Sequence, residues 1–364
     1  MKIFQILICC LNLIPVCSFT SVNSLMTVSF LTKILHLKVN QNVNNNKNKR
    51  TFFLENKEFK ENNIIKNVKK TNKINSFFKL IRSSYILPTV LLSVSGGWII
   101  KPSYKSLIKS KSFIVSIVTT LLVMSSSMII NDIYDVELDK INNPNRPIVN
   151  GELKVSEAII YFVALLGLTE YLTFLYLPNN LKLIMQLIII KINIYTPILK
   201  KMLLVKNISC ASLVSFSLYF SGLAATNNNI LYDQKKYRLL TTTISYIFYG
   251  SLTNEIILDM RDIDGDKQNN IVTIPSLFGN ENAWTITNLI MNYNIISNTV
   301  ALSYLYNPKI GSIIFFIVTP IMLKLYDIKK DNYSVISIKK YMSFSNYPLF
   351  FTLIYLCFVS RFYK

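Results

Sequence analysis

Long apolar segments recur through the second half of the chain, and they constrain the fold more than any other feature. The chain has 364 residues, of which 51% are hydrophobic, and its mean hydropathy is +0.37. Its apolar segments approach the roughly 20 residues that a helix needs to cross the hydrocarbon core of a membrane. A soluble protein of this length would not repeat such segments. The sequence therefore predicts an all-α, polytopic membrane protein.

The apolar segments predict about nine membrane helices, which form one domain over residues 77–364. An odd number of helices places the two ends of this domain on opposite sides of the membrane. The loops after the second, fourth, sixth and eighth helices then share one side. The expected spans are 83–100, 112–132, 155–176, 181–199, 207–225, 239–259, 283–305, 309–326 and 342–361.

Two segments of different composition precede this domain. Residues 1–18 have an apolar core and small residues before an expected cleavage after Ser18, which is typical of a secretory signal peptide; the alternative is a short membrane helix. Residues 19–76 are rich in Asn, Lys and Ser and lack the apolar content for a packed core. A signal followed by such a leader resembles the two-part presequence of secondary plastids. We therefore expect a plastid membrane protein, with an endomembrane location as the alternative.

The formal net charge of +20 does not indicate nucleic-acid binding, because the basic residues are scattered over the leader and short loops. The five cysteines have neither zinc-finger nor redox-pair spacing, so disulfides are not expected. The only histidine, His36, lies in the leader. Acid, base and ligand chemistry in the membrane domain is therefore expected from carboxylates, Tyr, Lys and Arg.

An acidic motif ends the second apolar segment. If the helix continues through it, Asn131, Asp132, Asp135 and Asp139 fall within about 100° of one another, and Glu137 points elsewhere. Carboxylates on one face repel each other unless a cation joins them. Oxygen ligands without nitrogen or sulfur suit Mg²⁺, which commonly also holds substrate phosphates.

A second acidic motif ends the sixth apolar segment, on the same predicted side of the membrane. On the same helical count, four of its carboxylates fall within about 60° of one another: Glu255, Asp259, Asp262 and Asp266. Asp264 lies off this face, and Gly265 is able to break the helix before Asp266. Two such motifs are suited to bracket one diphosphate with two or more Mg²⁺ ions. The alternative is that both are ordinary acidic helix ends exposed to water.

These motifs resemble the paired signatures of the UbiA-type membrane prenyltransferases. The first signature is matched by Asn131 to Asp139 together with Arg146-Pro147-Ile148 and Gly151, and the second by Asp259 to Lys267 together with Thr273-Ile274-Pro275 and Phe278-Gly279. Tyr195-x-Pro197 with its trailing lysines looks like the end of the family's fourth helix. Arg82 before Leu87-Pro88 is similar to the start of its first helix. The resemblance covers roughly residues 80–300.

The resemblance implies a Mg²⁺-dependent reaction of a polyprenyl diphosphate. Mg²⁺ ions would be held by Asn131, Asp135 and Asp139 on one side and by Asp262 and Asp266 on the other, with Asp132 and Asp259 in support. The remaining phosphate charge would be neutralised by basic side chains: Lys140, Arg146, Lys200 or Lys201, and Lys267.

The resemblance also implies an apolar tunnel, open to lipid, for the prenyl chain. Tyr195 would face the allylic cation, because an aromatic face attracts positive charge, and Arg82 would line the substrate pocket. The alternative for Tyr195, Lys200 and Lys201 is that they only anchor the protein at the membrane interface.

The acceptor of the prenyl group is left open by the sequence. A quinone or tocopherol precursor is favoured for a plastid enzyme, and chlorophyllide and a glycerol-phosphate ether are the alternatives. A cation transporter would also use same-side carboxylates, but it would place them nearer the middle of the membrane. A non-catalytic membrane scaffold would not need two motifs with metal-binding spacing.

Overall fold

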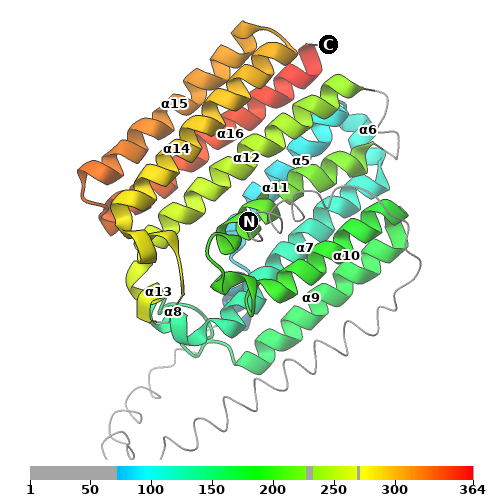
Figure 1. Ribbon diagram of the computed structural model, residues 1–364. Coiled ribbons are helices and arrows are strands. Elements are labelled where there is room, and N and C mark those ends of the chain that lie inside the picture. Colours follow the sequence, from blue (N-terminus) through cyan, green and yellow to red (C-terminus); the bar gives the residue numbers. More distant parts are fainter. Residues whose placement is uncertain (1–71, 227–232, 269–270, 364) are drawn as a thin grey trace, which may run out of the picture. The chain divides into compact units, whose positions relative to one another are not determined.

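The computed structural model describes residues 72–226, 233–268 and 271–363, and these belong to one compact unit (Figure 1). The predicted signal peptide and nearly all of the predicted leader lie outside the described residues. Within the described residues every regular element is a helix. The prediction of an all-α protein is therefore confirmed.

Nine of these helices have 15 or more residues. They are α5 (Ile86–Ile100), α7 (Lys111–Tyr134), α9 (Val155–Tyr176), α10 (Asn179–Tyr195), α11 (Val205–Ala225), α12 (Gln234–Arg261), α14 (Ile274–Leu305), α15 (Pro308–Lys330) and α16 (Val335–Phe362). The short helical elements are α4 (Lys73–Leu80), η1 (Ser83–Tyr85), α6 (Tyr104–Lys109), α8 (Val136–Asn142), η2 (Leu199–Lys201) and α13 (Ile263–Gln268).

Six of the long helices in the described residues are long and apolar enough to cross a membrane by themselves: α5 with η1, α7, α9, α11, α15 and α16. The other three are weaker by the same criterion. Helix α10 has only 17 residues, and α12 carries charged residues at both ends, which shortens its apolar part. The chain is thus a polytopic membrane protein, and the number of nine crossings stays a prediction.

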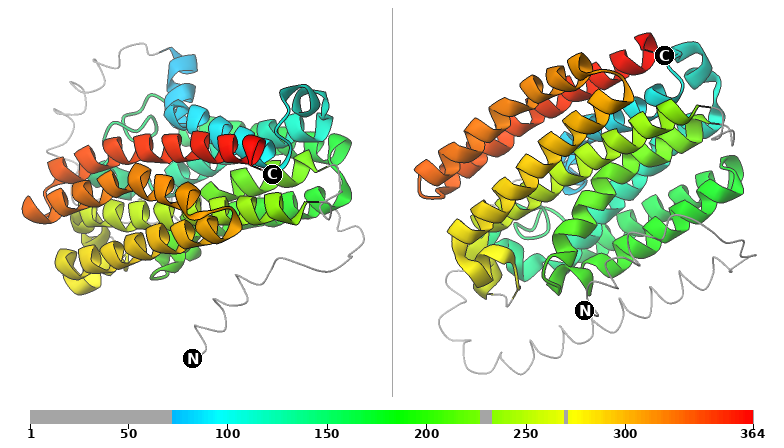
Figure 2. Two further views of the ribbon diagram at one scale, coloured as in Figure 1. Left: turned by 90° about the horizontal axis from the view of Figure 1, so that it is seen from above. Right: turned by 45° about the horizontal axis from the view of Figure 1, so that its top comes forward.

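Two apolar cores lie on either side of a central pair of helices, α5 and α11. One core joins α12, α14, α15 and α16 to buried residues of the central pair, such as Leu92 and Leu218. The other joins α4, α7, α9 and α10 to Phe216 and Phe220 of α11. Figure 1 shows the two groups of helices on opposite sides of this pair, and the right view of Figure 2 shows the same order.

The central helices α5 and α11 are in backbone contact. A Cβ atom at Gly96 would lie 2.0 Å from the carbonyl oxygen of Leu218, and one at Gly222 would lie 3.3 Å from the carbonyl oxygen of Gly96. Small residues allow membrane helices to approach this closely. The two helices run in the same direction, so their first turns lie at the same end of the bundle. That end also receives the two acidic motifs.

Candidate active site

Both acidic motifs interrupt their helices at the same place. Helix α7 ends at Tyr134 and α12 at Arg261, and the next residues, Asp135 and Asp262, have nearly identical backbone angles, φ −96°, ψ 12° and φ −97°, ψ 12°. New helices, α8 and α13, start directly afterwards. The condition under which the angles were counted, one helix continuing through each motif, is therefore not met.

The interruptions preserve the helical hydrogen bonds that space the carboxylates. The Asp139 amide donates to the Asp135 carbonyl at 2.7 Å, and the Asp266 amide donates to the Asp262 carbonyl at 3.0 Å. Each motif therefore keeps a carboxylate at i and another at i+4 although its long helix has ended.

The two motifs meet where α8 lies beside α13 (Figure 1). At Gly265, inside α13, a Cβ atom would lie 2.0 Å from Oδ1 of Asn142 at the end of α8. The expectation that Gly265 breaks the helix is wrong, because α13 continues through it to Gln268. Gly265 instead permits the close approach of the two motifs.

The first aspartate of each motif is buried and paired with a cation from a central helix. Arg82, just before α5, donates to Oδ1 of Asp132 at 2.8 Å. Lys206, in the first turn of α11, donates to Oδ1 of Asp259 at 2.6 Å, and Asn207 donates to its Oδ2 at 2.8 Å. The parallel pair of central helices thus holds one aspartate of each motif.

The middle residues of the motifs are also paired. The Lys200 ammonium forms an ion pair with Asp135, and Thr196 donates a hydrogen bond to Asn131. Arg261 binds both carboxylate oxygens of Asp262, each at 2.7 Å. Asp135 and Asp262 are only half-buried, so a ligand from solvent can reach them.

The last aspartate of each motif is buried with weaker partners. Asn143 donates to Asp139 at 3.0 Å, while burial raises the pKa of Asp139. Asp266 lies 3.9 Å from the ammonium of Lys206. Burial raises the pKa of Asp266 to about 6, although Lys206 and, more weakly, Lys200 oppose the shift.

Four buried polar atoms of this region have no hydrogen-bond partner among the described residues. They are Nε of Arg82, Nε of Arg146, Oδ2 of Asp132 and Oδ2 of Asp266. Arg146 lies 3.8 Å from Asp132 and 3.9 Å from Asp139, which is too far for a good hydrogen bond. Unsatisfied acceptors and donors beside each other are suited to bind a cation together with an anion.

In the part of the chain that the structure describes, no three acidic, histidine or cysteine side chains converge on a single metal position. Two neighbouring carboxylates with amide oxygens provide an oxygen-only set of ligands. Mg²⁺ is commonly bound by one or two carboxylates, with substrate phosphates and water completing its coordination. The arrangement fits such an ion, provided that an anionic ligand binds with it.

A comparison with protein families gives a match over residues 86–347 to the UbiA prenyltransferase family. This range covers most of the described helices and both acidic motifs. The chain belongs to the UbiA prenyltransferase family. The resemblance seen in the sequence is therefore confirmed.

Similar UbiA proteins include a digeranylgeranylglyceryl phosphate synthase of Sulfurisphaera tokodaii, which is 28% identical over 64% of this chain and 81% of its own length. Among solved structures, one that concerns digeranylgeranylglyceryl phosphate synthase in membranes has a TM-score of 0.60 and 19% identity. It covers 80% of this chain and 99% of that chain. A UbiA homologue from Archaeoglobus fulgidus bound to GPP and Mg²⁺ has a TM-score of 0.56 and 19% identity, covering 77% of this chain and 99% of that one. At these identities the solved structures show the shared fold.

Three basic residues that the UbiA resemblance assigned to the diphosphate lie at the surface of the site region. Lys140 is paired with exposed Glu137 at 2.8 Å. Lys201 and Lys267 are exposed and make no ion pair among residues 72–226, 233–268 and 271–363. Lys200 and Arg146, in contrast, lie against the carboxylates. The structure thus brings two of the five predicted cations into the acidic cluster.

Tyr195 is buried at the end of α10, where the Cys210 thiol donates to its hydroxyl at 3.0 Å. Glu255 lies near this thiol, and the charges of Lys206 and, more weakly, Arg82 act on its carboxylate without an ion pair. Glu255 is half-buried and makes no ion pair among the described residues. It therefore differs from the aspartates of the two motifs, all of which have cationic partners apart from the exposed Asp264.

The site assignments made from the sequence omitted several residues that the structure places at the motifs: Asn143, Thr196, Lys206, Asn207 and Arg261. Lys206 could have been predicted to lie beside an acid, because a lysine at the start of an apolar helix needs a nearby acid or solvent. The others could not, since a lone Asn or Thr near a helix end is common.

Proposed function

We propose that this chain catalyses the Mg²⁺-dependent transfer of a polyprenyl group, of geranylgeranyl or phytyl type, from its diphosphate to a lipophilic acceptor. The observation that carries the proposal is the meeting of two equally spaced acidic motifs where α8 lies beside α13. Membership of the UbiA family and the Archaeoglobus fulgidus homologue bound to GPP and Mg²⁺ support it.

The proposed Mg²⁺ ligands are Asn131, Asp135 and Asp139 in the first motif and Asp262 and Asp266 in the second. Asp132 and Asp259 support them, because both are buried and already bonded to Arg82 and Lys206. The unsatisfied Oδ2 of Asp266 is suited to a metal ion. When bound, Mg²⁺ supplies positive charge that stabilises the departing diphosphate.

Basic side chains at the same place would bind the diphosphate oxygens. Arg146 has a buried Nε without a hydrogen-bond partner among the described residues. Lys200 forms an ion pair with the half-buried Asp135. Charge-assisted hydrogen bonds from such groups hold phosphate strongly. The exposed lysines, Lys140, Lys201 and Lys267, would contribute from the rim as the site closes around its substrate.

The reacting carbon would lie deeper than the diphosphate, near Tyr195 and Glu255. The bond between the allylic carbon and the diphosphate oxygen breaks, the ring of Tyr195 stabilises positive charge on that carbon, and a nucleophilic atom of the acceptor forms the new bond. The acceptor then loses a proton. Glu255 is the carboxylate that we assign to receive it, because it lacks a cationic partner among the described residues.

For the acceptor we propose a phosphorylated glyceryl lipid. The relatives named digeranylgeranylglyceryl phosphate synthase support this class. The buried Nε of Arg82, without a hydrogen-bond partner among the described residues, offers a donor for an acceptor phosphate. A quinone or tocopherol precursor, which the sequence favoured, and chlorophyllide are the alternatives. The leader composition supports a plastid membrane as the location, and imaging a fluorescent fusion of residues 1–76 tests that proposal.

The test is a transfer assay with purified protein in vesicles and radiolabelled geranylgeranyl diphosphate. A glyceryl-phosphate ether, homogentisate and chlorophyllide serve as parallel acceptors, each with Mg²⁺ and with a chelator. Magnesium-dependent labelling of the glyceryl ether is the expected result. Labelling of another acceptor would support prenyl transfer but replace the acceptor that we assign. Cation uptake into the vesicles without any prenylated product would instead indicate a transporter.

A further inference from the structure

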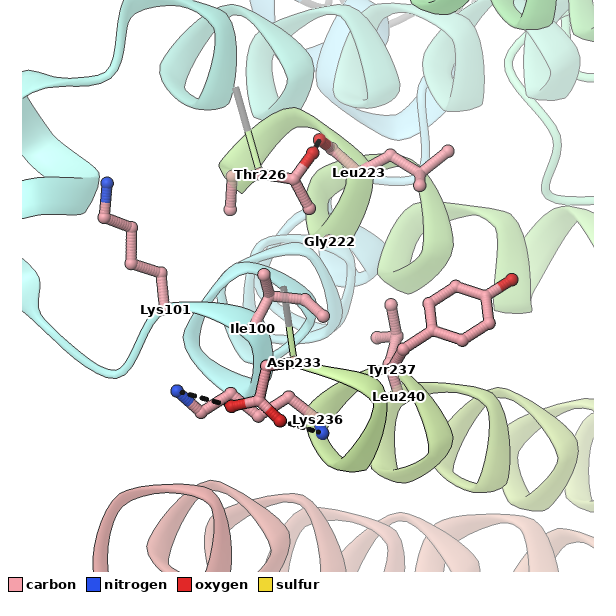
Figure 3. Close-up of a pocket in the computed structure, with 10 residues that line it drawn as sticks. Ile100, Lys101, Gly222, Leu223, Thr226, Asp233, Lys236, Tyr237 and Leu240 are labelled. Atoms are coloured by element: carbon pink, nitrogen blue, oxygen red, sulfur yellow. Dashed lines mark hydrogen bonds and ion pairs between the residues drawn. The ribbon is translucent and has the colours of Figure 1, made fainter. Parts of the chain in front are cut away.

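A cavity of about 190 Å³ lies at the end of the bundle where α5 and α11 end, opposite the acidic motifs. Figure 3 shows the residues that line it. It is formed where α5 and α11 end and α12 begins. Its floor is apolar, with Ile100, Gly222 and Leu240, and its rim carries Lys101, Asp233 and Lys236. The reaction proposed above uses none of these residues.

The rim of this cavity carries one net positive charge. Asp233 makes two interactions with Lys236: its carboxylate accepts a hydrogen bond from the Lys236 amide at 3.0 Å and lies 3.4 Å from the Lys236 ammonium. Lys101 extends from the other side of the cavity and has no ion pair or hydrogen bond from its side chain within the described residues (Figure 3). Two lysines and one aspartate leave a charge of +1, which matches one phosphodiester group.

Both lysines are half-buried although lysine side chains usually extend into water. A lysine at a membrane interface typically packs its apolar stem against the protein while its ammonium reaches water. Lysine is also flexible, so its ammonium can adjust to a bound phosphate. The cavity therefore combines adaptable cations with an apolar floor.

The whole end of the bundle around the cavity is strongly basic. Among the described residues this end has a single acid, Asp233, and ten basic residues: Lys101, Lys105, Lys109, Lys111, Lys182, Lys235, Lys236, Arg238, Lys309 and Arg361. The exposed rings of Tyr104 and Tyr237 lie at the same end, where membrane proteins commonly place aromatic side chains. Basic clusters at this depth attract anionic lipids.

We propose that this cavity binds the headgroup of an anionic phospholipid. The phosphodiester would lie between Lys101 and Lys236, and the first carbons of the acyl chains would lie on the apolar surface of Ile100 and Leu240. Because α5 and α11 end here and begin at the active site, such a lipid would hold together the two central helices whose first turns lie beside Arg82 and Lys206. The proposal does not depend on the proposed transferase reaction.

The test measures lipid binding to the full-length protein in neutral detergent at 150 mM salt, a condition that screens distant charges. The probes are dihexanoyl phosphatidylglycerol, dihexanoyl phosphatidylcholine with the same chains, and glycerol phosphate without chains. Native mass spectrometry gives the affinity of the first bound molecule. We expect phosphatidylglycerol to bind at least about tenfold more tightly than the other two. Equal binding of phosphatidylcholine, or of glycerol phosphate alone, would overturn the lipid headgroup assignment.

The decisive variant is Lys101→Gln/Lys236→Gln. The matched control is Lys105→Gln/Lys109→Gln on the adjacent α6, which removes the same charge from exposed positions. Loss of two cationic contacts predicts a decrease of about thirtyfold in affinity for phosphatidylglycerol, with little change in the control. An equal decrease in both variants would mean general attraction to a basic surface and would refute a cavity site. Thermal unfolding without lipid shows whether each variant is folded, and Lys101→Gln alone is the milder test if the double variant is not.

Discussion

Gly265 and Asn142 are in contact across the two acidic motifs, so any side chain at position 265 would require Asn142 to move. A Cβ atom there would lie 2.0 Å from Oδ1 and 2.7 Å from Nδ2 of Asn142. These residues are more than 120 positions apart in the chain. Their contact fixes how close the carboxylates of one motif come to those of the other.

Gly265→Leu is expected to abolish most prenyl transfer, because a branched side chain must push α13 away from α8. Gly265→Ala should lower the free energy of unfolding by only about 1–3 kcal/mol and reduce transfer partly, since the end of the Asn142 side chain can turn aside. Adding Asn142→Ala to Gly265→Ala should restore activity. Transfer rates in vesicles measure these effects. Gly167→Ala is the control, because a Cβ atom at Gly167 has nothing within 4 Å; an equal loss there would contradict a local cause.

Asp262→Asn and Asp135→Asn should each lower transfer by about 100-fold or more while the protein still accumulates in membranes. Each change removes one negative charge from a half-buried proposed Mg²⁺ ligand. Asp264→Asn is a matched control on the same segment, because Asp264 is exposed and has no ion pair among the described residues. Near-normal turnover of either ligand variant would remove that residue from the metal site.

Lys206→Met should destabilise the protein by about 3–5 kcal/mol, since it leaves the buried Asp259 without its cation. The double variant Lys206→Met/Asp259→Leu should regain much of that stability but not the transfer activity. Thermal unfolding in detergent measures the first effect and the vesicle assay the second. Lys324→Met breaks an exposed pair with Asp327 and should change stability by less than about 1 kcal/mol. Full activity in the double variant would show that this pair serves only folding.

Mg²⁺ affinity should decrease as the pH falls through 6. Burial raises the pKa of Asp266 to about 6, so at lower pH a proton competes with the metal for this carboxylate. With that pKa, affinity at pH 5 should be about tenfold below its value at pH 7.5. Because the pKa of Asp266 is higher in the folded state, its protonation stabilises the folded state as the pH falls from 7 toward 4. The decrease in Mg²⁺ affinity would therefore not result from unfolding caused by Asp266. Titration calorimetry with Mg²⁺ and a non-reactive diphosphate measures the effect. A constant affinity between pH 5 and 7.5 would contradict it.

The proton-acceptor role of Glu255 predicts a loss of rate with little change in diphosphate affinity. Glu255→Gln keeps the size of the side chain but cannot take a proton at neutral pH. The maximal rate should fall by about 100-fold, while binding of the prenyl diphosphate stays within about twofold. A fall in binding as large as the fall in rate would instead place Glu255 among the groups that hold the substrate.

The helical membrane fold and the two acidic motifs could be predicted from local features of the chain. Apolar length is a local property, and the spacing of Asp135 with Asp139 and of Asp262 with Asp266 is fixed by helical hydrogen bonds within a few residues. The family of the chain also followed from these motifs, and the comparison over residues 86–347 confirmed it.

Which charges meet could not be predicted in this way, because it depends on how distant helices pack together. The identity of a basic residue does not specify its partner. Arg82 reaches Asp132 because α5 packs beside α7, and Lys206 reaches Asp259 because α11 packs against α12. The interruptions at Asp135 and Asp262, and the need for Gly265 beside Asn142, likewise depend on packing between distant segments. Sequence spacing describes one helix at a time, whereas a site shared by two motifs depends on the distance between helices.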